Sequence, residues 1–301
     1  MHDILPVPGT VGPMTEPDGT VGPASGPDGG TVEPTTEQTG TVGTLTELNG
    51  SPAGPEALRA LALTNYGHFT TLTAEDGAVR GLDLHLARLV RDCRVLFDAP
   101  LDLGRVRAWA RRAVPTTGRC TVRITVFDPS LHLGTIGADA DPRVLVTSRP
   151  APAAVPEPLR VRSAVYLRDL PEVKGVGLFG VLRLRRWARR SGFDDVLFTD
   201  GDATVLEGGT WNVGVVRDGR VVWPAGPALA GTARELLRRA GAGTDARVTL
   251  PQLAACEAVF ATNAAVGVVP VTQVDDLRFP ADHPVVTGLA ERYASLPAER
   301  L

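Results

Sequence analysis

One side chain of the sequence can act as an amine nucleophile: that of Lys174, within the segment LPEVKGVGLFG at residues 170–180. It is the only lysine among 31 Lys and Arg residues, so all the others are arginine. Arginine keeps its proton at working pH, whereas a neutral lysine amine can add to a carbonyl as a Schiff base. A lone lysine could also be a stray surface residue in an arginine-biased sequence. The surrounding residues must therefore decide between the two interpretations.

Downstream of Lys174, the sequence supplies a carboxylate and two turns that could bind an anion. Glu207 ends a predicted strand, and Asn212 follows five residues later. The segment LAGTAR (229–234) opens a predicted helix, and ATNAA (261–265) forms a polar turn. Helix N-termini and tight polar turns present free backbone N–H groups to phosphate. One amine, one carboxylate and two such turns are what a pyridoxal 5'-phosphate (PLP) site requires.

The same stretch contains a GxGxxG pattern, formed by Gly175, Gly177 and Gly180, with Asp200 lying 25 residues after its first glycine. A dinucleotide-binding loop of this type follows directly on an apolar strand. Here the charged segment RDLPEVK, which includes Pro171, precedes the glycines. We therefore do not interpret the pattern as a dinucleotide site.

Composition excludes several other classes. The net charge of −3 argues against nucleic acid as the main partner, and no run of 18 apolar residues predicts a membrane span. Cys93, Cys120 and Cys256 form no CxxC pair, which favours a reducing cytoplasm over a disulfide scaffold or a zinc site. The five histidines show no HExxH-type pairing, so we predict no metal.

The chain divides into four predicted parts. Residues 1–50 repeat the theme PGTVGP with few large apolar residues, which indicates a disordered low-complexity tail. A small α/β domain is expected over 51–150, a proline-rich interdomain linker over 151–160, and a larger domain over 161–301.

Periodicity predicts the elements of these domains. Apolar residues at helical spacing over 82–97 indicate an amphipathic helix. A hairpin is predicted at Asp218-Gly219. Further strands are expected near 67–73, 120–128, 142–149, 161–168, 194–200 and 203–207, and helices near 103–114, 178–191 and after Gly231. This order predicts an α+β fold rather than a regular βαβ repeat.

In order, these motifs resemble the class IV, PLP-dependent aminotransferases, a family that includes branched-chain and D-amino-acid aminotransferases and aminodeoxychorismate lyase. The resemblance covers roughly residues 62–275. It is carried by YGHFTTL (66–72), LHLARL (84–89), VRITVFD (122–128), Lys174, LEGGTWN (206–212), LAGTAR and ATNAAVGVVPV (261–271).

The resemblance implies a fold-type-IV PLP enzyme, α+β, with a small N-terminal α/β domain and a larger C-terminal mixed α/β pseudobarrel domain. It also implies a homodimer that moves an amino group between an amino acid and a 2-oxo acid. Lys174 would be the catalytic residue and would form the Schiff base with PLP. The residues implied to bind the cofactor are Arg88, Lys174, Glu207, Asn212, Gly231, Thr232, Thr262 and Asn263. The residues expected at the substrate are Tyr66, His68, Arg123 and Trp211.

The sequence departs from the family at three points. Phe179 stands where branched-chain enzymes carry a tyrosine, Gly231-Thr232-Ala233 shifts a hydroxyl by one residue, and Phe69-Thr70-Thr71 lacks the acid of the first strand. The apolar Phe179 leaves a PLP-dependent lyase open as an alternative. A pseudoenzyme on the same fold is a second alternative.

Overall fold

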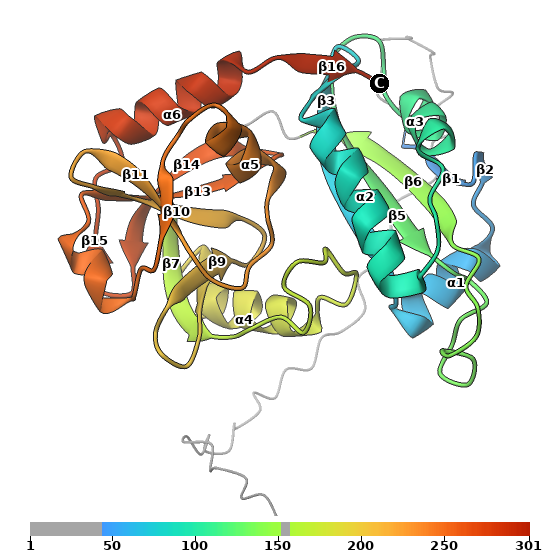
Figure 1. The fold of residues 1–301 in the computed structure, drawn as a ribbon, viewed down its shortest axis with the longest axis horizontal. Coiled ribbons are helices and arrows are strands. Elements are labelled where there is room, and N and C mark those ends of the chain that lie inside the picture. The colour runs from blue at the N-terminus through green and yellow to red at the C-terminus, as the bar shows by residue number, and fades with distance from the viewer. Residues whose placement is uncertain (1–43, 152–156) are drawn as a thin grey trace, which may run out of the picture. The chain divides into compact units, whose positions relative to one another are not determined.

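The computed structural model of the chain describes residues 44–151 and 157–301. Within these residues, seven strands form a first sheet in the order β16-β4-β3-β5-β6-β1-β2, with every neighbouring pair antiparallel. The strands are β1 (Thr46–Leu48), β2 (Ser51–Pro52), β3 (His68–Glu75), β4 (Ala78–Arg80), β5 (Arg119–Phe127), β6 (Arg143–Pro150) and β16 (Ala298–Arg300). The edge strand β16 comes from the end of the sequence, whereas the other six strands come from residues 46–150; β16 nevertheless lies beside β4 in the sheet (Figure 1).

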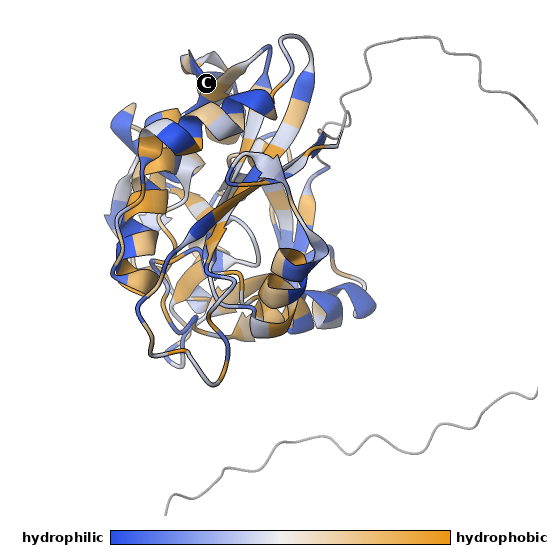
Figure 2. Cartoon of the chain, turned by 90° about the vertical axis from the view of Figure 1, so that its right-hand side faces the viewer, coloured by the Kyte–Doolittle hydropathy of each residue, from blue (hydrophilic) through white to orange (hydrophobic). Residues whose placement is uncertain are grey.

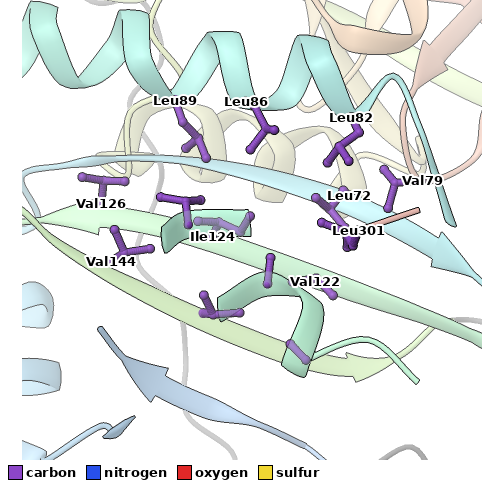
Figure 3. Packing of buried hydrophobic residues seen from close by; sticks show 14 of the residues in the cluster. Leu72, Val79, Leu82, Leu86, Leu89, Val122, Ile124, Val126, Val144 and Leu301 are labelled. Atoms are coloured by element: carbon purple, nitrogen blue, oxygen red, sulfur yellow. The ribbon is translucent and has the colours of Figure 1, made fainter. Parts of the chain in front are cut away.

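One face of this sheet is covered by α2 (Leu82–Phe97) and α3 (Leu103–Arg112) (Figure 1). Leu82, Leu86 and Leu89 of α2 point toward the sheet, as Figure 3 shows, where they meet side chains such as Leu72 and Ile124. Burial of each such side chain contributes about 1.5–3 kcal/mol. Because side chains alternate along a strand, the intervening residues of β3 and β5 face the other side.

Nine strands of the described chain form a second sheet, in the order β12-β11-β10-β13-β14-β7-β8-β9 with β15 paired to β14. It is mixed, because β14–β7, β7–β8 and β11–β12 are parallel pairs. Figure 1 shows it curling partly around on itself. The strands are β7 (Leu159–Val165), β8 (Asp195–Thr199), β9 (Val205–Gly208), β10 (Asn212–Arg217), β11 (Arg220–Pro224), β12 (Thr244–Ala246), β13 (Ala258–Asn263), β14 (Gly267–Val274) and β15 (Leu277–Arg278).

The helices are amphipathic, and Figure 2 shows hydrophobic and hydrophilic residues interspersed along them. For the second sheet, Val181 and Leu184 of α4 pack on Phe198 of β8, while α5 and α6 pack on β13 and β14. None of the described helices is both long and apolar enough to span a membrane. The remaining helical elements are α1 (Pro55–Thr64), α4 (Phe179–Arg190), η1 (Pro251–Ala255, 3-10), α5 (Thr232–Arg239) and α6 (Pro284–Ser295).

The structure shows what two sequence features, the predicted hairpin and Asp200 of the GxGxxG pattern, form in the fold. The predicted hairpin joins β10 to β11, and Asp218 and Gly219 both have positive φ, at 51° and 66°, as a two-residue I′ turn requires. Asp200 caps the turn between β8 and β9 by accepting hydrogen bonds from the amides of Asp202 and Thr204. These two hydrogen bonds give Asp200 a structural role in the turn.

The GxGxxG stretch does not follow directly on a strand, because β7 ends at Val165 and a loop lies between.

The predicted α+β class is confirmed by this architecture. Most of the predicted tail lies outside the described residues, although β1 falls within its last positions. Part of the predicted linker, residues 152–156, also lies outside them. The domain boundaries stay predictions, and β16 adds a C-terminal strand to the first sheet.

Leu89 offers a direct test of the packing under α2. It is fully buried, so Leu89→Ala should lower the free energy of unfolding by about 2–5 kcal/mol through lost contacts and a residual cavity. Urea unfolding monitored by circular dichroism measures this. Leu133→Ala is the matched control, because Leu133 is 97% exposed and its truncation should change the free energy by less than about 0.5 kcal/mol. Equal losses in the two variants would contradict the packing described.

Candidate active site

A cavity of about 320 Å³ collects most of the residues predicted to do chemistry. Its wall is formed by the face of the first sheet that α2 does not cover, by the loop before α4, and by ends of strands of the second sheet. The predicted residues that line it are Arg88, Arg123, Lys174, Glu207, Trp211, Asn212, Gly231, Thr262 and Asn263. Residues separated by up to 175 positions in the sequence are thereby brought together.

Lys174 lies in the loop between β7 and α4. The backbone of this loop is hydrogen-bonded to the residues at the start of β3. The carbonyl of Lys174 accepts a hydrogen bond from the amide of Phe69 (2.9 Å), and the amide of Val176 donates to the carbonyl of Gly67 (2.9 Å). The amine of Lys174 stands 4.9 Å from the centre of the Phe69 ring. The backbone pairing therefore aims the side chain into the cavity.

The surroundings of Lys174 disfavour its charged form. Burial is the largest cause, followed by the nearby cations Arg88 and Arg168, and together they lower the pKa of the amine from 10.5 to about 7. Glu207 acts in the opposite direction, and Arg123 adds a smaller lowering effect. At neutral pH, a substantial fraction of the amine is therefore unprotonated and nucleophilic.

Glu207, on β9, is the only carboxylate among the residues that line this cavity, and it is 4% exposed. Its Oε1 lies 2.8 Å from Nε of Arg168, and its Oε2 accepts a longer hydrogen bond from the Leu229 amide (3.4 Å). Burial raises the pKa of Glu207, whereas Arg168 and the amide oppose that rise. Arg168 thus supports a buried negative charge at this position.

A corner of the cavity around the N-terminus of α5 has the features of a phosphate site. Nine buried side-chain polar atoms of the described chain have no hydrogen-bond partner, and three of them belong to residues of this region: Oγ1 of Thr232, Oγ1 of Thr262 and Nε of Arg88. Arg88 and Thr262 line the cavity, whereas Thr232 is the first residue of α5, directly after Gly231 in its wall. Arg88 reaches this corner from α2, since it also donates to the carbonyl of Ala230. The α5 N-terminus adds the partial positive charge of a helix end. Hydroxyls, a guanidinium and helix amides are donors that suit a phosphate.

A glycine is required in this corner. A Cβ on Gly231 would lie 1.9 Å from Oδ1 of Asn212, too close for any side chain. Asn212 itself is held by donating from Nδ2 to the carbonyl of Leu229 (2.7 Å). Asn263 turns the chain between β13 and β14, because its side-chain oxygen accepts from the amides of Ala265 and Val266. These two asparagines position the turns that border the corner.

On the opposite wall, the guanidinium of Arg123 stacks over the ring of Phe69 at 3.6 Å from its centre. Its Nε donates to Oγ1 of Thr125 (3.2 Å). Trp211 is held on the second-sheet side, where its Nε1 donates to Asp195 (3.2 Å). Both side chains are thus fixed before any substrate arrives.

Two predicted substrate residues lie elsewhere. Tyr66 lines a neighbouring cavity of about 180 Å³, and its hydroxyl donates to the carbonyl of Leu96 (2.8 Å). The side chain of His68 is fully buried, with its ring 6.1 Å from that of Phe97. Strand alternation is the reason, because His68 shares the α2 side of β3 with Leu72. For these two residues, the geometry therefore gives no support to a substrate contact.

Sequence reasoning missed several residues of the wall. Arg168 and Arg149 line the cavity, but single arginines carry no local signal in so arginine-rich a chain. Phe69 and Thr71 could have been found from strand parity, since both alternate with the apolar Leu72. Phe179 is 79% exposed at the start of α4, and Leu178 lines the cavity instead.

The low pKa of Lys174 has a measurable consequence. Its amine should acetylate slowly below pH 7 and rapidly above it, with a midpoint near pH 7, because only the neutral form reacts. Treating ligand-free protein with acetic anhydride across pH 5–11, and quantifying the Lys174 peptide by mass spectrometry, gives the profile. The urea-unfolded chain is the control, with a midpoint expected near 10.4. Coincident midpoints for folded and unfolded protein would show that the amine is not enclosed as described.

Comparisons with known proteins agree with this geometry. The family model of the class IV aminotransferases ("Amino-transferase class IV") matches residues 67–274. A comparison with curated protein sequences found no match.

Solved structures share the fold at low sequence identity. A branched-chain aminotransferase from Thermoproteus uzoniensis, solved with norvaline, aligns with a TM-score of 0.73 at 19% identity over 84% of this chain and 94% of its own. A hypothetical aminotransferase from Mycobacterium tuberculosis, in its PLP-bound form, has a TM-score of 0.67 at 23% identity, covering 78% and 90%.

A fold IV transaminase from Curtobacterium pusillum has a TM-score of 0.63 at 24% identity, covering 75% of this chain and 83% of that protein. The likeness to these structures establishes the shared fold, and the family model spans more than half of the sequence. The chain belongs to the class IV aminotransferase family.

Proposed function

We propose that the protein is a PLP-dependent aminotransferase that moves an amino group between an amino acid and a 2-oxo acid. One observation carries the proposal. The only lysine of the chain places an amine with a pKa of about 7 in an enclosed cavity that also holds a buried carboxylate and a phosphate-type corner.

The residues present fit PLP. Thr232 Oγ1, Thr262 Oγ1 and Arg88 Nε are buried donors that have no partner among the described residues, and they suit the oxygens of a phosphate group. Glu207, supported by Arg168, is the carboxylate that would hold a proton on the pyridine nitrogen. When bound, PLP supplies a ring that accepts the electron pair released as a bond at the substrate Cα breaks.

Lys174 acts twice in this scheme. Its neutral amine would be the nucleophile that holds the cofactor, and burial among Arg88, Arg168 and Arg123 keeps enough of it unprotonated near pH 7. In its second role, the Nζ atom of Lys174 would accept the proton from the substrate Cα. The backbone contacts with Phe69 and Gly67 hold the loop for both steps.

The cavity also fits an anionic substrate. Four arginines and Lys174 line it against the single carboxylate of Glu207. After a phosphate has paired with Arg88 and Arg168 has paired with Glu207, Arg123 and Arg149 are left to bind substrate carboxylates. A further structure of the M. tuberculosis aminotransferase contains alpha-ketoglutarate and PMP, which supports a 2-oxo acid as substrate here.

We further propose a homodimer in the cytoplasm. Exposed apolar side chains recur between residues 165 and 182 of the sequence, including Val165 (71% exposed), Phe179 (79%) and Leu182. Burial of such side chains against a second copy would stabilise a dimer. The three cysteines are free and buried, as suits a reducing compartment.

Replacing Lys174 tests the function. Lys174→Arg places a permanently protonated guanidinium at this position, which cannot form a Schiff base with an aldehyde, so kcat for amino transfer from amino-acid pools to 2-oxo acids should fall at least about 10³-fold. Lys174→Ala should be equally slow and should regain part of its rate when a small primary amine such as methylamine is added. An active Lys174→Arg variant would refute the proposal. Pyruvate release without any 2-oxo acid acceptor would indicate the lyase instead.

Glu207 tests the role of the carboxylate. Glu207→Gln should retain the cofactor but lower kcat about 10²–10³-fold, because a neutral amide does not keep the pyridine nitrogen protonated. Steady-state kinetics measures the loss, and the cofactor absorbance band reports occupancy. Glu56→Gln is the control, since Glu56 is exposed on α1 and, among the described residues, forms an ion pair with Arg59 alone. Wild-type turnover in Glu207→Gln would show that the carboxylate does not face the ring.

A further inference from the structure

A second carboxylate near Lys174, that of Asp92, lies outside the cavity and is fully buried on α2. Both of its oxygens are engaged. Oδ2 accepts a hydrogen bond from the backbone amide of Lys174 (3.0 Å), and Oδ1 accepts from Nε (3.0 Å) and Nη2 (2.7 Å) of Arg91. Asp92 therefore connects the helix directly to the residue that carries the amine.

Arg91 adds a second link to the same loop. Its Nη2 donates to the carbonyl of Glu172 (2.6 Å), two residues before Lys174. From the other side, β3 binds the Lys174 carbonyl through the Phe69 amide. Both backbone polar groups of Lys174 are thus occupied, one by α2 and the other by the first sheet.

Packing alone does not account for a carboxylate at position 92. Removing a charge from water costs several kcal/mol unless that charge is paired and hydrogen-bonded. The neighbouring buried positions of α2, such as Leu89 and Cys93, are apolar. The charge of Asp92 is compensated by the backbone amide of Lys174 and by the guanidinium of Arg91. The first group belongs to the Lys174 loop, and the second binds that loop at Glu172.

Asp92 also lies one helical turn after Arg88, which extends into the phosphate-type corner. Residues four apart share a helix face, about 6 Å apart along the axis. Burial lowers the pKa of Arg88 to about 10, and the negative charge of Asp92 opposes that lowering. The helix α2 therefore carries both Arg88, which extends into the phosphate-type corner, and Asp92, which binds the loop of Lys174.

We infer that Asp92, together with Arg91, is a positioning residue that fixes the backbone of residues 172–174 so that the Lys174 side chain projects into the cavity at a set distance from the phosphate corner. The role in catalysis rests on the proposed function, whereas the mechanical role does not. Asp92 contacts neither cofactor nor substrate in this arrangement and acts through Lys174.

Hydrogen–deuterium exchange of the full-length, PLP-supplied protein tests the mechanical role. Asp92→Asn cannot satisfy both Arg91 and the Lys174 amide, so the peptide covering residues 170–176 should exchange about tenfold faster than in wild type. Arg91→Gln changes a half-exposed side chain, should fold readily, and should accelerate the same peptide. Asp83→Asn is the matched control, because Asp83 lies on the same helix, is exposed, and forms its ion pair with Arg239 of α5 rather than with the Lys174 loop.

Steady-state kinetics tests the catalytic consequence. Asp92→Asn and Arg91→Gln should lower kcat about tenfold or more with little change in KM, since the amine is misplaced while the substrate pocket is intact. Asp83→Asn should match wild type.

The inference is overturned if the peptide covering residues 170–176 exchanges as in wild type in both variants. It is also overturned if Arg91→Gln leaves the exchange of this peptide unchanged while Asp92→Asn accelerates exchange in α2 and the first sheet as much as in the peptide. Finally, it is overturned if the wild type is active and both variants have the same kcat as the wild type. A wild type that neither binds PLP nor transfers amino groups, yet shows the selective loosening in the variants, would refute the proposed function while supporting the positioning role.

Discussion

The proposed chemistry depends on keeping one amine neutral in a cavity whose charged side chains are four arginines and one carboxylate besides the amine itself. Lys174 is enclosed with Arg88, Arg168 and Arg123 nearby, and each of them opposes its protonation. Protonation would place another positive charge in a poorly solvated space, so the pKa falls to about 7. The negative charge of Glu207 acts in the opposite direction and raises the pKa of the amine. However, Glu207 forms its ion pair with Arg168.

The fold explains how such a cavity can be built. The first sheet buries one face under α2 and turns the other toward the cavity, where Phe69 and Arg123 stack. The second sheet contributes Glu207 at the end of β9 and the turn after β13, while α5 begins at the glycine that allows Asn212 to approach. Each of these residues stands on, or beside, an element held by a hydrophobic core. The site is therefore assembled before any ligand binds.

Much of this arrangement was predictable from the sequence, for specific reasons. Helical spacing of leucines predicted α2, and Asp218-Gly219 predicted the hairpin, because both signals are local. The lone lysine stood out by composition alone. Arg168 did not, since its importance comes from a contact with Glu207, 39 positions away in the sequence. For His68 the useful signal is strand alternation: His68 lies an even number of residues from the buried Leu72, so both side chains point to the same, α2-covered face of β3.

The most direct test of the account is covalent trapping at the single lysine. Borohydride reduction of the PLP-loaded protein, followed by proteolysis and mass spectrometry, locates the attached group. Because the chain has one lysine, only Lys174 or the terminal amine can be labelled. We expect one phosphopyridoxyl group, on the peptide containing DLPEVKGVG (169–177). An unmodified Lys174 in protein that retains PLP would contradict the central claim that this residue binds the cofactor.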